Sequence, residues 1–387
     1  MDKKVSARQS NFELLRVFAM IMIVMHHITL HAIYDQVNFA DSINALGNAY
    51  FCYPRFFPQL WLVDLGTIFG PVADLIFVMI SGYFLVEKGK RSVTGTTLKL
   101  LTQSLFAALV VTVANCLYHV LGFSYNDLFL SARDDLISSN RFEFFNESFW
   151  YIGFYFLVFV FGVLFLNDFL NKLSKKQYIE YLLILFAIIE FSFSREFINS
   201  ISNYILVFVI GVFFYSLGGF IKKFDPFRHI NVLIILFVMI LTLAGTFFST
   251  YYCRMFDIER YLRSGSEYNY FQALYVYNFH NILVVVNTVC LFELFKRIRI
   301  KNSRILNYLG AASFMAYLIH DNEFFYTLWY KYDWCKALYV NPWEFVCNLI
   351  TVALLTFGIG VLIYSVYKPI FNGIKKLAVN EKGSEKS

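Results

Sequence analysis

The stretch FELLRVFAMIMIVMHHITLHAI, Phe12–Ile33, decides the fold class of this chain. It is apolar over enough length to cross a bilayer core of about 30 Å as a helix. Arg16 and His27 lie eleven residues apart in it. At about 100° per residue they share one helix face, roughly 16 Å apart along the axis. Such groups are costly in lipid, so the pair predicts a polar site inside a membrane protein.

The composition extends this prediction to the whole chain of 387 residues, which is 58% hydrophobic and 16% charged. Its mean hydropathy is +0.57. We predict an all-α integral membrane bundle of about ten transmembrane helices, formed by residues 1–374 as one domain, with a polar cytoplasmic tail at 375–387. The predicted spans are Phe12–Ile33, Trp61–Val86, Leu98–Leu121, Phe149–Leu170, Tyr178–Phe193, Tyr204–Phe220, Ile230–Tyr252, Tyr275–Leu294, Ile305–Leu328 and Phe345–Val366.

Most of the 33 Lys and Arg residues fall in alternate segments between these runs. Because positive loops are retained in the cytoplasm, both termini are predicted to be cytoplasmic. The net charge of +6 then reflects membrane topology, and no nucleic-acid partner is expected. The first run is too long for a signal peptide and lacks a small-residue cleavage site, so it is expected to remain in the protein.

Each residue of the Arg16 and His27 pair has a structural alternative. Arg16, near the cytoplasmic boundary, is suited to phosphate groups, although it could instead snorkel to lipid headgroups. His27, near mid-membrane, is suited to take a proton from a hydroxyl, although it could instead make an interhelical hydrogen bond. The spacing of the pair favours function. The six cysteines show no metal-binding spacing, so no metal is expected, and pairing of Cys52, Cys253 or Cys335 is left open.

Five blocks of this chain resemble the membrane acyltransferase-3 family. The first, RQSNFELLRVFAMIMIVMHH, has the family's basic residue, ten positions and then a histidine, at Arg16 and His27. The others follow in the family's order: FVMISGYFL (Phe77–Leu85), FWYIGFYFLVFV (Phe149–Val160), NYILVFVIGVFFY (Asn203–Tyr215) and SFMAYLIHDN (Ser313–Asn322).

The resemblance implies a ten-helix O-acyltransferase in the plasma or inner membrane. It implies transfer of an acyl group, usually acetyl, from acetyl-CoA as donor substrate to a surface glycan such as capsule or exopolysaccharide, with no permanently bound cofactor. His27 would be the essential histidine, acting as a base or carrying the acyl group, and Arg16 would hold the donor. The family's later Arg-x-x-Arg motif has only an approximate counterpart among Lys88, Arg91 and Lys99.

Further candidates for a substrate cavity are weaker. Ser81 precedes a glycine, and the pair is typical of close helix packing. Trp150 and Tyr155 could line a cavity or anchor a helix at the interface. Asn278 is a candidate sugar ligand, and His320, beside Asp321, is either a second site histidine or a structural one. Rival functions are a transporter or flippase of lipid-linked sugars, predicted to show paired repeats, and a membrane sensor or scaffold.

Overall fold

The computed structural model describes residues 8–34, 36, 56–88, 93–121, 150–264 and 281–384. Across them the chain is helical, with no strand. The elements are α1 (Ser10–Ile28), the π-helical turn η1 (Thr29–Ile33), α4 (Phe56–Leu85), α5 (Thr94–Val120), α7 (Trp150–Phe161), the π-helical turn η5 (Gly162–Leu166), α8 (Asn167–Lys172), α9 (Lys175–Glu190), α10 (Ser192–Ile201), α11 (Asn203–Phe224), α12 (Val232–Ser264), α13 (Ile282–Arg297), α14 (Arg304–His320), α15 (Glu323–Tyr330), α16 (Trp334–Val340) and α17 (Pro342–Ser384).

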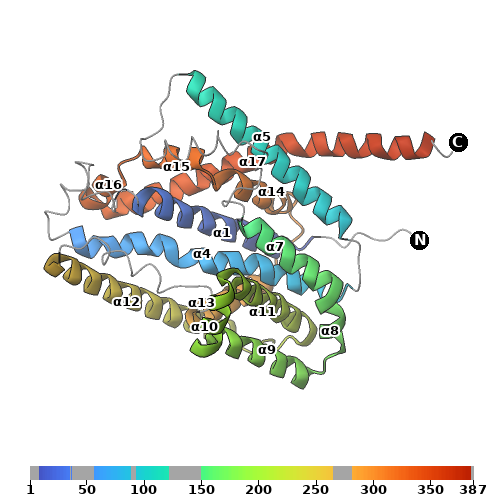
Figure 1. Cartoon of the computed structure of the whole chain (residues 1–387), viewed down its shortest axis with the longest axis horizontal. Helices are drawn as coiled ribbons and strands as arrows, with labels where there is room; N and C mark the ends of the chain where they lie inside the picture. Colours follow the sequence, from blue (N-terminus) through green and yellow to red (C-terminus); the bar gives the residue numbers. More distant parts are fainter. Residues whose placement is uncertain are drawn as a thin grey trace.

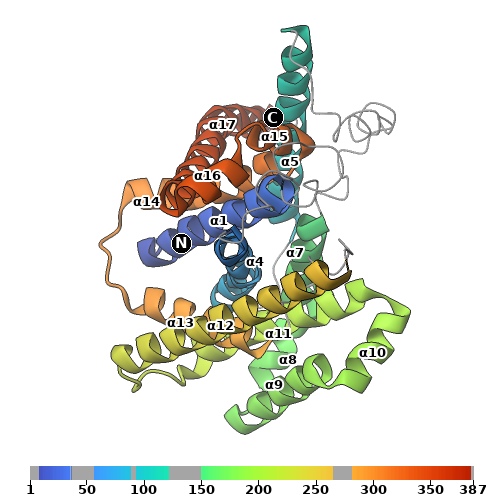
Figure 2. The same cartoon turned by 90° about the vertical axis from the view of Figure 1, so that its left-hand side faces the viewer.

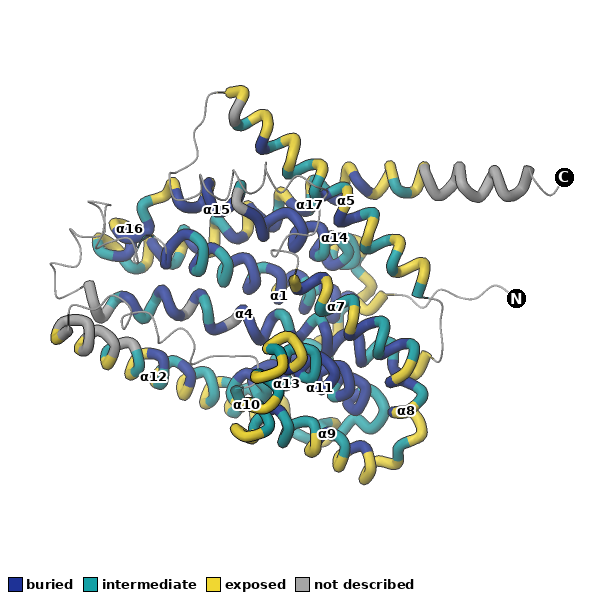
Figure 3. The backbone as a smooth tube through the Cα atoms, viewed as in Figure 1, coloured by how far each residue is buried: buried dark blue, intermediate teal, exposed yellow. Residues whose placement is uncertain are grey.

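α1 and α4 lie side by side in the middle of the bundle (Figures 1 and 2). α14 and α17 cover α1 on one side, and α11 packs against α4 on the other. The outward faces of α5 and α12 are exposed (Figure 3). Buried residues make up 71% of the most apolar window of α4 but only 11% of that of α12. The polar residues of α1 are therefore placed in the interior, while α12 presents apolar side chains outward, as a lipid-facing helix does.

Seven helices of the described chain are long and apolar enough to cross a membrane, each at a predicted span. The other three predicted spans are helical but short: α9 and α13 each have 16 residues and α14 has 17. α9 ends because Phe191 adopts an extended backbone. The all-α membrane class is thus confirmed in the part described, whereas the count of ten spans is not.

The predicted span Ile305–Leu328 is not one helix, which corrects the sequence prediction. α14 ends at His320, and the backbone of Asn322 is extended. The Asn322 side chain then caps α15 by accepting a hydrogen bond from the Phe325 amide at 3.3 Å. A side-chain oxygen at this position satisfies one of the free amides at a helix start. The sequence HDN therefore ends one helix and begins another inside an otherwise apolar run.

Basic residues at the ends of described helices lie together at one end of the bundle. Lys223 of α11 donates to the Leu173 carbonyl at 3.0 Å, and Lys296 of α13 lies 2.6 Å from the Asp225 carboxylate. α1 begins and α17 ends at this end in Figure 1. That this end faces the cytoplasm remains a prediction from the charge pattern.

α1 is fastened to the C-terminal half of the chain at both of its ends. Ser10 Oγ accepts from the Ser303 amide at 2.8 Å and donates to Asn307 Oδ1 at 3.0 Å. At the opposite end, Gln36 Oε1 accepts from the Trp334 amide at 2.9 Å. These bonds join segments almost 300 positions apart in sequence. The position of α1 therefore depends on α14 and α16.

α4 and α11 approach backbone to backbone, and glycines make this possible. A Cβ on Gly82 would overlap the Tyr215 main-chain oxygen and lie 2.7 Å from its carbonyl carbon. A Cβ on Gly218 would overlap the Met79 main-chain oxygen. The Ser81-Gly82 pair thus has the close-packing role that its sequence suggested.

Gly82→Ala is expected to lower the thermal unfolding midpoint of the purified protein, because α4 and α11 must separate to admit the methyl group. Overpacking of this kind costs about 1–3 kcal/mol. Gly245→Ala is the matched control, since nothing lies within 4 Å of a Cβ there and alanine favours a helix. An unchanged midpoint in the Gly82 variant would contradict the packing.

Two of the cysteines predicted to be external lie in helices, Cys253 in α12 and Cys335 in α16, and Cys335 is a free thiol. Cys52 lies outside the described residues. Burial raises the pKa of the Cys335 thiol to about 12, so it stays protonated and behaves as a small apolar side chain.

Candidate functional site

Arg16 and His27 have the helical spacing in the structure that their sequence positions predict. Both lie within the regular part of α1, since its π-helical turn begins only at Thr29. They therefore share a face and stand about 16 Å apart along the axis. His27 contacts His320 of α14, whereas Arg16 pairs with Glu13 of the same helix. The site accordingly has two parts, a basic cluster near Arg16 and a histidine pair at His27.

His27 and His320 form a direct side-chain contact, with Nδ1 of His27 2.8 Å from Nε2 of His320. Their ring planes differ by only 13° at a centroid separation of 4.9 Å. A contact of 2.8 Å between the nitrogens, together with a centroid separation of 4.9 Å, places the two rings edge to edge in nearly one plane. The two histidines come from α1 and from the last residue of α14, so the end of α14 delivers the second imidazole.

The hydrogen bonds of His320 determine which nitrogen of His27 is free. His320 Nδ1 lies 2.8 Å from the Tyr317 carbonyl and 3.1 Å from the Ala316 carbonyl, both of which can only accept. A neutral His320 therefore carries its proton on Nδ1 and accepts at Nε2, and His27 donates from Nδ1. By this assignment of the protons, His27 Nε2 keeps a lone pair and is available as a base.

Asp321 lies next to the histidine pair, with Oδ1 3.5 Å from His27 Nδ1. Its carboxylate is 4% exposed and accepts hydrogen bonds from the hydroxyls of Tyr317 and Tyr326. Tyr326 also stacks on His31, with ring centroids 3.9 Å apart. A fixed carboxylate at this place stabilises the positive charge that forms when His27 takes a proton. The sequence indicated Asp321 only as the neighbour of His320.

Glu13 organises the basic cluster at the other part of the site. Its carboxylate is almost completely buried and lies 2.7 Å from Arg16 Nη1 and 3.4 Å from Arg8 Nη1. α14 passes closely here, since a Cβ on Gly310 would overlap Glu13 Oε2. One carboxylate thus holds two guanidinium groups, and an excess of positive charge remains for an anion.

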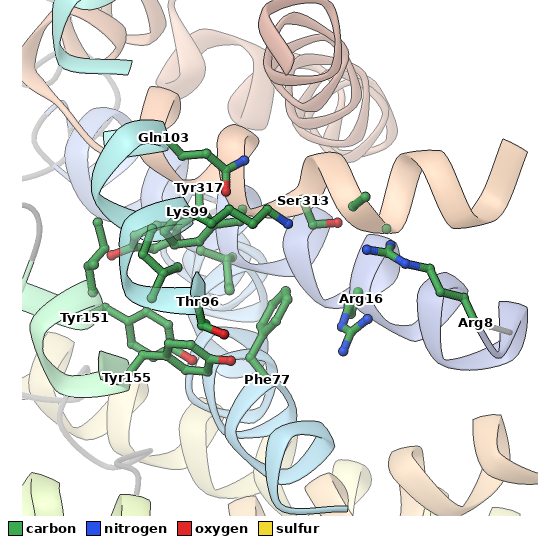
Figure 4. Close-up of a pocket in the computed structure, with 16 residues that line it drawn as sticks. Arg8, Arg16, Phe77, Thr96, Lys99, Gln103, Tyr151, Tyr155, Ser313 and Tyr317 are labelled. Atoms are coloured by element: carbon green, nitrogen blue, oxygen red, sulfur yellow. The ribbon is translucent and has the colours of Figure 1, made fainter. Parts of the chain in front are cut away.

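A cavity of about 240 Å³ extends from this cluster into the bundle, between α1, α4, α5, α7 and α14 (Figure 4). Cationic side chains line one part of it, and tyrosines line another; the lining includes Arg8, Arg16, Lys99, Gln103, Tyr151, Tyr155, Ser313 and Tyr317. It also includes Ile23 and Tyr317, which lie about one helical turn from His27 and His320. Neither histidine lines the cavity itself, but its deeper part therefore lies near the histidine pair.

The structure brings together part of the predicted site. Arg16, Lys99 and Tyr155 line the cavity. Ser81 does not line it, but its Oγ is 2.8 Å from the Tyr155 hydroxyl. Because Ser81 Oγ itself donates to the Phe77 carbonyl at 2.9 Å, Tyr155 is the donor to it. Ser81 therefore positions Tyr155.

Other predicted residues lie apart from the cavity. Trp150 packs on Tyr151 and Phe154 and is 39% exposed. Lys88 is exposed just beyond the end of α4. Arg91 and Asn278 lie outside the described residues. Gln103, Tyr151 and Tyr317 were not singled out by the sequence, since one amide and two of 27 tyrosines carry no local signal. Among the described residues, no three His, Cys, Asp or Glu side chains are grouped as metal ligands.

Comparison with known protein families gives a match over most of the chain. A family model described as an acyltransferase domain, that of the acyltransferase-3 group, matches residues 9–365. No match is found among curated proteins or among solved structures. The matched region contains both histidines of the pair and, apart from Arg8, every residue of the basic cluster and of the cavity lining.

Proposed function

Because the chain belongs to the acyltransferase-3 family, and is therefore a membrane acyltransferase, we propose that it transfers an acyl group, with acetyl expected, from cytoplasmic acyl-CoA to a hydroxyl of a cell-surface polysaccharide or lipid-linked glycan. The observation that carries the proposal is the cavity that Arg8, Arg16 and Lys99 line and whose deeper part lies near the His27 and His320 pair. Its partners would be the bilayer, acyl-CoA and the glycan.

The basic cluster supports a donor with phosphate groups. Arg8 and Arg16 offer planar guanidinium groups that bind phosphate oxygens in pairs, and Lys99 adds a point charge from α5. The cavity lining also includes the apolar residues Phe77, Leu100 and Ile152. An acyl-CoA has this sequence of properties, with phosphates at one end and a thioester at the end of a long uncharged arm.

The histidine pair supports a base for the acceptor. His27 Nε2 would take the proton of the acceptor hydroxyl while the hydroxyl oxygen attacks the thioester carbonyl carbon. The carbon–sulfur bond then breaks, and the thiolate receives the proton from the His27 imidazolium, so that CoA leaves as a neutral thiol and the acceptor carries the ester. Asp321, 3.5 Å from His27, stabilises the imidazolium between the two proton transfers.

The direct test is transfer of radiolabelled acetyl from acetyl-CoA to the glycan fraction by vesicles that contain the purified protein. The expected product is a glycan ester that mild base cleaves, and succinyl-CoA in a parallel reaction tests the choice of acyl group. Movement of a lipid-linked sugar across the vesicle with no ester formed from any acyl-CoA would favour the flippase alternative and contradict the proposal.

A further inference from the structure

Gln103 is a buried polar side chain with an unused hydrogen-bond donor. It lies on α5 and is 1% exposed. Its Nε2 is buried and has no hydrogen-bond partner in the described structure. A buried donor without an acceptor carries a desolvation cost that a partner would remove. Gln103 also lines the cavity, so a bound molecule could supply that acceptor.

The place of Gln103 along the cavity indicates which part of a donor would meet it. It follows Lys99 by four residues on α5, one turn or about 6 Å further from the start of the helix. Figure 4 shows both side chains on this helix. Leu100, an apolar residue about one turn before Gln103 on α5, also lines the cavity. Phosphate groups are matched by the cations, so the group at Gln103 would be uncharged.

The other neutral polar groups of this part of the cavity already have acceptors in the protein. The Tyr151 hydroxyl donates to the Asp74 carbonyl at 2.6 Å, and the Tyr155 hydroxyl donates to Ser81. Tyr317 donates to Asp321 at 3.4 Å, and Ser313 to the Leu309 carbonyl at 3.3 Å. Of these five deeper polar side chains, Gln103 is the one whose donor is left for a ligand.

We propose that Gln103 binds the acyl-CoA arm, by donating a hydrogen bond from Nε2 to an amide carbonyl of the pantetheine. This inference rests on the proposed function and adds a donor-recognition residue to it. An amide carbonyl is a strong neutral acceptor, and the arm has two amides between its phosphates and its sulfur. Gln103 would therefore set the position of the arm after the phosphates have bound.

The test compares Gln103→Met with the unmodified full-length protein in vesicles, because methionine keeps the side-chain length and removes the donor. KM for acetyl-CoA is expected to rise about tenfold, because the lost hydrogen bond contributes about 1.4 kcal/mol. The value of kcat should stay within about twofold of that of the unmodified protein. Gln103→Leu, which removes the donor and adds no ionisable group, is expected to raise KM similarly.

Asn115→Leu is the matched control. Asn115 is also a buried amide of α5 with an unpartnered atom, but it does not line the cavity. Its variant should keep the KM for acetyl-CoA.

A second donor separates recognition from a structural role. S-butyl thioacetate has the thioester but no amide, so the Gln103 variants should use it as well as the unmodified protein does. Equal losses with both donors, or an unchanged KM for acetyl-CoA, would overturn the role of Gln103. Failure of the unmodified protein to use any acyl-CoA would instead refute the proposed function.

Discussion

His27→Ala is expected to lower kcat for acyl transfer by about 10²–10⁴-fold, the usual contribution of a positioned general base. The loss should appear in kcat, because Arg16, which would bind the donor phosphates, lies about 16 Å away along α1 and is unchanged. The measurement is transfer of labelled acetyl to glycan, together with KM for acetyl-CoA, at equal amounts of folded protein in the membrane.

His26→Ala is the matched control, since His26 is the adjacent residue on the same helix. Its Nδ1 lies 3.1 Å from the Thr67 carbonyl, away from the His320 contact, and its ring packs against Gly70. Its loss should leave kcat within a few-fold, although stability can fall. Full acylation by the His27 variant, or equal losses in both variants, would remove the argument for His27 as the base.

Arg16→Gln is expected to raise KM for acetyl-CoA by about 10- to 100-fold, because hydrogen bonds to charged groups contribute about 1.5–3 kcal/mol. Use of S-butyl thioacetate, which has no phosphate, should be nearly unaffected. The same substitution also destabilises the fold, since buried Glu13 then keeps only Arg8, at 3.4 Å. Binding and stability must therefore be measured separately.

The double variant Glu13→Gln/Arg16→Gln separates these two effects. It removes both members of the 2.7 Å ion pair, so it should unfold at a higher temperature than Arg16→Gln alone and yet keep the raised KM. If the double variant instead recovered the original KM, Arg16 would act only by neutralising Glu13, and its assignment to the donor phosphates would be wrong.

The sequence was sufficient for those features of the site that lie within one helix. The spacing of Arg16 and His27 follows from the helical repeat, and α1 has it because the run is apolar and free of glycine and proline. The cavity could not be predicted in the same way, because five helices meet to form it. The unpartnered amide of Gln103 and the carboxylate at Asp321 become informative only when their neighbours are known.

The number of spans shows the limit of reading hydropathy alone. The ten apolar runs are helical where described, but Tyr178–Phe193 and Ile305–Leu328 contain stops that apolar composition conceals. One stop is the extended backbone at Phe191, and the other is the Asn322 cap. Single polar or extended residues weigh little in an average over a long window, whereas they decide where a helix ends.

The ties of α1 to the C-terminal half have a consequence for biosynthesis. α1 is made early, but His27 meets His320 only after 293 further residues have been added. At about 5–20 residues per second this takes roughly 15 to 60 s. During that interval His27 lacks its partner from α14, and Gly310 of α14 does not yet cover Glu13. The nascent chain must therefore keep α1 at the translocon or in a temporary helix pairing, and a chain terminated before α14 should be recognised by quality-control proteases.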